Sequence, residues 1–165
     1  MISIKKELLV STSQATAFRV FSQQMDAWWP RSHHVGKTPM VSIVLEPKAN
    51  GRWYSTHQGG EVCEVGRVED FEPHSRLLLI WQLNGEFQFD PNLRSEVEVR
   101  FVSKGPEQTL VLFEHRDLEK LGKPTPTGSM DQGWTMILEL FVTLARDGKL
   151  AGEALRVYQS PSIKG

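Results

Sequence analysis

Residues 130–144 read Met-Asp-Gln-Gly-Trp-Thr-Met-Ile-Leu-Glu-Leu-Phe-Val-Thr-Leu, and this stretch decides the fold. Its large apolar residues recur every three or four positions, so they share one broad face of a helix with 3.6 residues per turn. We therefore predict a helix over about residues 130–148 whose apolar face must pack on another apolar surface. That face consists of Trp134, Ile137, Leu138, Phe141, Leu144 and Ala145.

The chain before this helix supplies the surface. Its apolar residues alternate with polar ones, and turn residues separate the alternating runs, which indicates antiparallel strands joined by short turns. An earlier helix is predicted over residues 14–24, with Ala17, Phe18 and Phe21 buried. Residues 11–13 offer side chains for its N-cap, and Ser11 with Gln14 fits a capping box. The predicted class is α+β, a helix-grip arrangement in which a curved antiparallel sheet wraps around the long C-terminal helix. Strands are expected at residues 2–10, 40–46, 52–56, 61–71, 76–83, 96–102 and 109–115.

Length and composition narrow the class of protein. The 165 residues predict one domain over residues 1–150, a crossing loop at 118–129 and a loosely held tail at 151–165. A net charge of -1 argues against a nucleic-acid-binding surface, and no apolar run is long enough to insert into a membrane. The N-terminal residues lack the pattern of a signal peptide, so we expect a cytoplasmic protein. The single cysteine, Cys63, excludes an internal disulfide, and we expect no metal and no cofactor.

Two residues are weak candidates for catalysis. His115 shares a strand face with Val111 and Phe113, so it should point toward the concave side of the sheet. It is either an acid/base group in a pocket or a buried structural histidine held by hydrogen bonds, and the second reading is favoured. Glu64 lies two residues after Val62, so the two share a strand face. Glu64 could therefore point into the cavity, where a buried carboxylate would need a partner.

Aromatic residues are the candidate walls of a ligand pocket, because the predicted strands and the long helix would place them between the two layers. Each is read either as a pocket wall or as ordinary core, and core is the favoured reading for any one of them. The predicted ligand-binding set is Trp53, Trp81, Phe101, Phe113, His115, Trp134 and Leu138. His33 and His34 lie in a predicted loop without the spacing of a metal site.

The order of these segments resembles the activator of Hsp90 ATPase homologue 1-like (AHSA1-like) family of the START-like (SRPBCC) superfamily. The resemblance covers about residues 4–148 and implies a START-like fold with an internal cavity, without implying one activity. Its motifs are Trp28-Trp29-Pro30, Gly51-Arg52-Trp53-Tyr54, Gly66-Arg67-Val68, Glu72-Pro73, the stretches 76–81 and 95–101, Glu114-His115-Arg116-Asp117-Leu118, and Gly133-Trp134.

Three functions are compatible with these features. The first is a binding protein that holds a small apolar or amphipathic molecule between the sheet and the C-terminal helix. The second is a cyclase- or hydrolase-type enzyme that uses the same cavity, with His115 as acid/base and Glu64 or Arg67 assisting. The third is an interaction protein that contacts a chaperone, or a partner copy in a homodimer. The apolar stripe and the absence of a catalytic motif favour the first.

Overall fold

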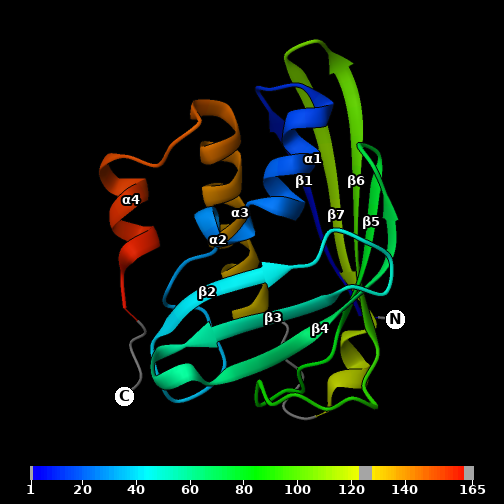
Figure 1. Cartoon of the computed structure of the whole chain (residues 1–165). Coiled ribbons are helices and arrows are strands. Elements are labelled where there is room, and N and C mark those ends of the chain that lie inside the picture. Colours follow the sequence, from blue (N-terminus) through cyan, green and yellow to red (C-terminus); the bar gives the residue numbers. More distant parts are fainter. Residues whose placement is uncertain (1, 123–127, 162–165) are drawn as a thin grey trace.

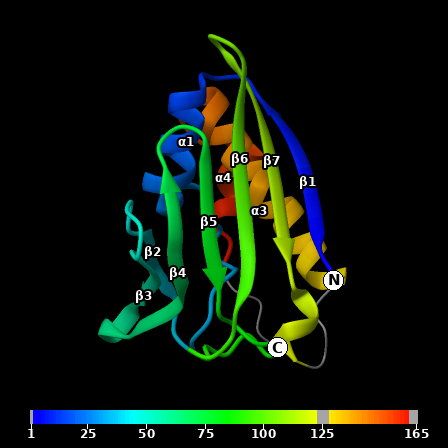
Figure 2. The ribbon, with the colours of Figure 1, turned by 90° about the vertical axis from the view of Figure 1, so that its right-hand side faces the viewer.

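A computed structural model of the chain describes residues 2–122 and 128–161. Within these residues, seven strands form one antiparallel sheet in the order β1-β7-β6-β5-β4-β3-β2 (Figures 1 and 2). β1 is an edge strand and pairs with β7, with Ile4 opposite His115. The first and the last strand in the sequence are therefore neighbours in the sheet. The strands are β1 (Ile4–Val10), β2 (Met40–Leu45), β3 (Arg52–His57), β4 (Val62–Glu72), β5 (Arg76–Trp81), β6 (Ser95–Gly105) and β7 (Gln108–Arg116).

The long helix α3 (Gly128–Asp147) lies across the concave face of this sheet (Figure 1). All six residues of its predicted apolar face are buried, so the prediction from residues 130–144 is confirmed. Beside it lie α1 (Gln14–Gln23) and the short α2 (Met25–Trp28), with Ala17, Phe18 and Phe21 of α1 buried as expected. Short 3-10 helices occur at Gln58–Gly60 and Leu118–Leu121. The second of these occupies part of the predicted crossing loop, of which residues 123–127 lie outside the described residues.

Of the predicted cap residues of α1, Ser13 is the one that caps the helix. Its Oγ accepts a hydrogen bond of 3.2 Å from the backbone N–H of Thr16, which corrects the capping box expected from Ser11 and Gln14. Ser11 lies in the turn that leaves β1, where the Thr12 N–H donates to the carbonyl of Val10. The sheet pairing of β1 extends to Val10, which leaves Ser11 in this turn, while the helix begins at residue 14 as predicted.

This correction gives a direct test. Ser13→Ala is expected to lower the free energy of unfolding by about 1 kcal/mol, because a helix N-terminal N–H loses its partner. Urea denaturation measures the change. Ser11→Ala is the matched control and should stay within about 0.5 kcal/mol of the unmodified protein. Equal losses in the two variants would show that Ser13 is not the cap.

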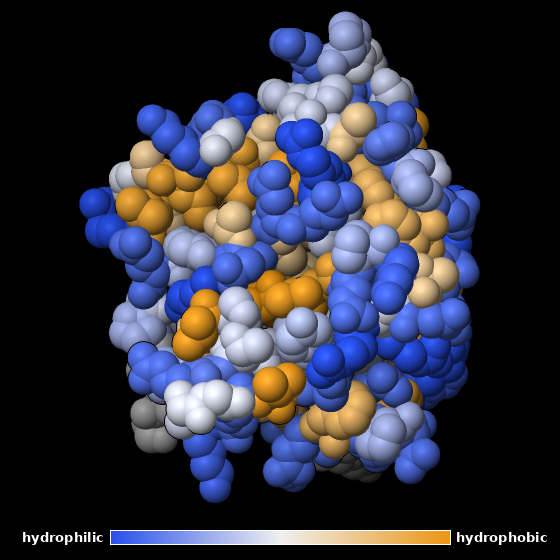
Figure 3. All heavy atoms as spheres, in the orientation of Figure 1, coloured by the Kyte–Doolittle hydropathy of each residue, from blue (hydrophilic) through white to orange (hydrophobic). Residues whose placement is uncertain are grey.

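The expectation of a loosely held tail is wrong for the described part of it. Residues Gly152–Gln159 form α4, and the hydroxyl of Tyr158 donates to the carbonyl of Asp26 at 2.7 Å. The backbone N–H of Arg31 donates to the Tyr158 carbonyl, and the Arg31 guanidinium lies 5.1 Å from the centre of the Tyr158 ring. Apolar surface still surrounds α4 on the side toward α3 (Figure 3), and α4 has no fully buried residue.

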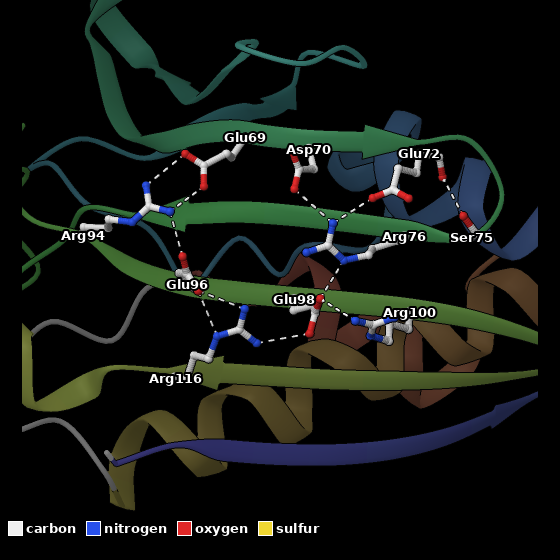
Figure 4. A network of polar contacts seen from close by, with 10 residues as sticks. All are labelled: Glu69, Asp70, Glu72, Ser75, Arg76, Arg94, Glu96, Glu98, Arg100 and Arg116. Atoms are coloured by element: carbon white, nitrogen blue, oxygen red, sulfur yellow. Dashed lines mark hydrogen bonds and ion pairs between the residues drawn. The ribbon is translucent and has the colours of Figure 1, made fainter.

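The outer face of the sheet carries a network of arginines and carboxylates across β4 to β7 (Figure 4). Arg76 contacts Asp70, Glu72 and Glu98, while Arg116 contacts Glu96 and Glu98. Glu96, Glu98 and Arg100 thus face outward, as the alternation of β6 predicts. Because these groups remain partly accessible to water, each pair contributes about 1 kcal/mol or less.

Candidate binding pocket

A pocket of about 380 Å³ lies between the first half of α3 and the part of the sheet formed by β2 to β5. From α3, Met130, Gly133, Trp134 and Ile137 line it, which are positions one turn apart on one helix face. The loop that follows α2 and the loop that follows β5 complete the wall. Phe87 in the second loop is 44% exposed, so an aromatic ring lies at the border between the pocket and solvent.

Tryptophans dominate the inner wall. Trp29 after α2, Trp53 in β3, Trp81 in β5 and Trp134 in α3 form a closed ring of contacts, with ring centres 5.7 to 6.2 Å apart. Trp29, Trp81 and Trp134 line the pocket, and Trp53 lies behind them, fully buried. Contacts between aromatic rings at these distances stabilise the wall beyond the area that they bury.

The indole N–H groups of these four tryptophans differ in their hydrogen bonding. That of Trp29 donates to the carbonyl of His33 at 2.6 Å, and that of Trp134 donates to Nδ1 of His115 at 3.2 Å. Among the described residues, no hydrogen-bond acceptor is found for the indole N–H of Trp53 or of Trp81. A buried donor without an acceptor lowers stability by about 1 to 3 kcal/mol.

The structure separates the predicted ligand-binding residues into two groups. Trp81 and Trp134 are part of the pocket wall. The others are buried but outside the lining: Trp53, Phe101, Phe113, His115 and Leu138. Phe113 supports the wall from behind, with its ring centre 4.6 Å from that of Trp134. Phe101 instead packs against Phe18 and Phe21 of α1.

His115 is completely buried behind the tryptophan wall. An indole N–H can only donate, so Nδ1 of His115 is unprotonated and Nε2 carries the hydrogen. Nε2 donates to Oγ of Ser95 at 3.0 Å, and the Ser95 hydroxyl donates to the carbonyl of Trp81 at 3.0 Å. Burial lowers the pKa of His115 to about 3. This geometry supports the structural reading of His115 over the acid/base reading.

Glu64 lies on the outer face of the sheet, contrary to the expectation that it could enter the cavity. Trp53 is opposite Gly66, whereas Tyr54 is opposite Glu64, so Val65 forms a β-bulge between them. The extra residue breaks the alternation of β4 and places Glu64 and Gly66 on opposite faces. Glu64 forms an ion pair with Arg52. Arg67 is also directed outward, and its guanidinium lies 3.4 Å from the carboxylate of Glu69.

Polar groups in the pocket come mainly from the loop after α2. Oγ of Ser32 and Nδ1 of His33 are 2.8 Å apart, and burial together with the neighbouring His34 lowers the pKa of His33. His34 Nδ1 is 2.8 Å from the carbonyl of Val35, so this nitrogen is the donor. His33 is therefore a neutral hydrogen-bonding group at neutral pH.

One further polar group comes from β3. Ser55 lines the pocket, and its Oγ is 2.8 Å from Nε2 of the buried His57. Nδ1 of His57 is 2.9 Å from the carbonyl of Thr38. Period-two alternation in Arg52–His57 could have indicated this pair, since Trp53, Ser55 and His57 share a face. Trp29, His33 and Phe87 line the pocket because of how their loops fold over it. No local sequence pattern indicates that loop arrangement.

Among residues 2–122 and 128–161, no three histidine, cysteine, aspartate or glutamate side chains cluster closely enough to hold a metal ion. In the same ranges, no helix has both the length and the apolar character needed to cross a bilayer.

The fold and the position of the pocket agree with a family assignment. Residues 11–146 match the sequence model of the family described as activator of Hsp90 ATPase homolog 1-like protein. The chain belongs to this family. No functionally curated protein matches it. AHSA1-like proteins share the START-like, helix-grip architecture seen here, so the predicted fold class is confirmed.

Solved structures extend the comparison of this AHSA1-like protein. The anthrahydroquino-gamma-pyrone synthase Txn09 is 30% identical, with a TM-score of 0.57 over 88% of this chain and 94% of that one. The self-sacrificing resistance protein CalC from Micromonospora echinospora is 26% identical, with a TM-score of 0.63 over 91% and 97% of the two chains. The Aha1 dimer from Colwellia psychrerythraea shares the fold at 12% identity, with a TM-score of 0.65 over 91% and 100%.

Proposed function

We propose that this AHSA1-like protein binds a small aromatic molecule in the pocket between α3 and the sheet. The observation that carries the proposal is a cavity of about 380 Å³ walled by Trp29, Trp81 and Trp134. Small-molecule sites are concave, mostly apolar and supplied with a few polar groups that orient the ligand. Here the polar groups are His33, His34 and Ser55.

The comparison with Txn09 supports an aromatic, polycyclic ligand class. Txn09 is a synthase of an anthrahydroquino-gamma-pyrone, and it is 30% identical to this chain over nearly its full length. Flat fused rings suit a wall of indoles, because aromatic rings gain offset-stacked and edge-to-face contacts beyond the area they bury. A ligand carbonyl would also offer an acceptor to the indole N–H of Trp81.

The proposal is tested by filling the pocket. Gly133 of α3 faces the cavity, and a Cβ placed on it would meet the ring of His33 at 3.7 Å, an ordinary contact. Gly133→Leu should place a branched side chain in the cavity and reduce the affinity for anthraquinone-type ligands at least about tenfold, or about 1.4 kcal/mol. Gly133→Ala is the matched control, because it adds one methyl group and should bind nearly as well.

Thermal shift and titration calorimetry give the readout. At a ligand concentration about 100 times the Kd, binding stabilises the folded protein by about 2.7 kcal/mol, or roughly 5 to 10 °C in Tm. Circular dichroism confirms that Gly133→Leu retains its helices. A panel of anthraquinones, flavonoids and fatty acids that produced no shift in the unmodified protein would refute a binding function.

A second candidate function is an enzyme of cyclase type in the same cavity, favoured by the similarity to Txn09, which is a synthase. If His115 is the acid/base of such an enzyme, His115→Ala should lower turnover by about two to four orders of magnitude. The burial of His115 behind Trp134 and the outward position of Glu64 give little support to a mechanism that uses these two residues. Homodimerisation and a chaperone contact stay predictions, which molar mass in solution and co-purification would test.

A further inference from the structure

Ser55 and His57 form a hydrogen-bonded pair on the pocket side of β3. Ser55 lines the cavity and His57 is only 3% exposed, with Oγ and Nε2 separated by 2.8 Å. On its other side, His57 Nδ1 contacts the carbonyl of Thr38 at 2.9 Å. The three groups form a chain that runs from the cavity to the loop before β2.

The direction of this chain follows from the chemistry of its end. A carbonyl oxygen can only accept, so Nδ1 of His57 carries a hydrogen and donates it to Thr38. In the neutral ring Nε2 is then an acceptor, and it receives the hydroxyl hydrogen of Ser55. The lone pairs of Ser55 Oγ are left for a donor, and no other described side chain contributes one to it.

The same geometry also accommodates a protonated ring. If Nε2 gains a proton, it donates to Ser55 Oγ, and the bond from Nδ1 to Thr38 is kept. The Ser55 hydroxyl is then released from His57 and can donate into the cavity. Both hydrogen bonds of the imidazole thus survive protonation, and only the direction of the Ser55 hydroxyl reverses.

We infer that Ser55 and His57 act as a proton relay that takes a weakly acidic hydroxyl, a phenol or an enol, from an aromatic ligand. The O–H bond of the ligand breaks and its proton passes to Ser55 Oγ, while the Ser55 proton passes to Nε2 of His57. The ligand is left as an oxyanion, which accepts a hydrogen bond from Ser55, and His57 becomes an imidazolium. No net proton enters or leaves, and no oxidant is needed. This inference rests on the proposed function.

The titratable groups nearest to His57 are His34, Glu61 and Cys63. The ring of His34 lies 5.3 Å from that of His57. The carboxylate of Glu61, Sγ of Cys63 and Cε1 of His57 all lie within 3.5 Å of the position that a Cβ on Gly36 would take. Burial, and then the charge of Glu61, raises the pKa of Cys63, so the thiol is neutral and Glu61 supplies a compensating negative charge.

The experiment uses two coloured probes of one shape class, 2-hydroxyanthraquinone and 2-methoxyanthraquinone. At a pH where free 2-hydroxyanthraquinone is neutral, the unmodified protein should shift its absorption to the longer wavelength of the phenolate. The apparent pKa of the bound dye should fall by about one unit or more, a tenfold shift in its ionisation. His57→Gln and Ser55→Ala should both bind the dye in its neutral form, and the exposed-site control His74→Gln should keep the full shift.

The outcomes separate the inference from the function on which it rests. Binding of both probes without any phenolate signal would overturn the relay and leave the binding function intact. Failure of both probes to bind would overturn the proposal that the pocket holds anthraquinone-type ligands, and the relay with it. A phenolate signal that persists in His57→Gln and in Ser55→Ala would assign the proton to another group. Nitrogen-15 spectra of the His57 ring should change from the Nδ1-protonated tautomer to the imidazolium when the dye binds.

Discussion

Gly66→Ala is expected to destabilise the fold by about 3 kcal/mol or more, because a side chain at this position overlaps backbone. A Cβ on Gly66 would lie 1.8 Å from the carbonyl oxygen of Ile80 and 3.5 Å from the ring of Trp53. The first contact is with the neighbouring strand β5 and can be relieved only by separating β4 from β5. The bulge at Val65 turns Gly66 into this position, so the glycine and the bulge act together.

Urea denaturation of the variant provides the measurement. Gly133→Ala is the control, since its added Cβ meets nothing closer than 3.7 Å and alanine favours a helix by up to about 1 kcal/mol over glycine. The Gly66 variant should also lose part of the pocket wall, because Trp53 and Trp81 are held by β3, β4 and β5. A Gly66→Ala protein as stable as the control would mean that the strand register here is wrong.

The second large effect is acid destabilisation through His115. Its ordinary pKa near 6.5 applies to the unfolded chain, and burial lowers the folded value to about 3. Between these values the unfolded chain binds a proton that the folded protein excludes, so lowering the pH favours unfolding. Stability from this group is complete above about pH 6.5 and falls by about 1.4 kcal/mol for each unit below it. At about pH 4.5 the loss is about 2.7 kcal/mol.

His115→Gln should flatten this dependence, because glutamine does not titrate and can still donate to Ser95 and accept from Trp134. The variant starts from a lower stability at pH 7, since the buried hydrogen bonds are less well aligned. The decisive quantity is the difference between the free energies of unfolding at pH 7 and at about pH 4.5, compared with the exposed-site control His74→Gln. If the unmodified protein and His115→Gln lost the same stability on acidification, the acid response would have to come from other groups.

The sequence predicted much of the fold because the relevant signals are local. The 130–144 stripe, the buried residues of α1 and the outward charges of β6 all follow from one period of residues read along one element. The predictions failed where one element constrained another. Pairing of β1 with β7 up to Val10 leaves Ser13 as the cap of α1 in place of the predicted capping box of Ser11, and contacts of Tyr158 with Asp26 and Arg31 hold a tail that was expected to be loosely held.

The candidate site was less predictable than the fold for the same reason. Trp81 and Trp134 could be placed at the pocket because each continues an apolar stripe on its own element. The face of Glu64 could not be predicted, because one bulged residue in β4 reverses the alternation of its side chains. A bulge depends on the partner strand, here β3, and not on the local sequence alone.

From the sequence alone come the order of strands and helices, the helix that fills the concave face and the resemblance to the AHSA1-like family. Tertiary structure alone decides which aromatic rings face an open cavity and which are sealed behind it. It also places the Thr38 carbonyl against His57 and the Trp134 indole against His115. Periodicity fixes the face of an element on which a side chain lies. The groups that this side chain contacts come from segments far away in the sequence, and tertiary packing decides which segments these are.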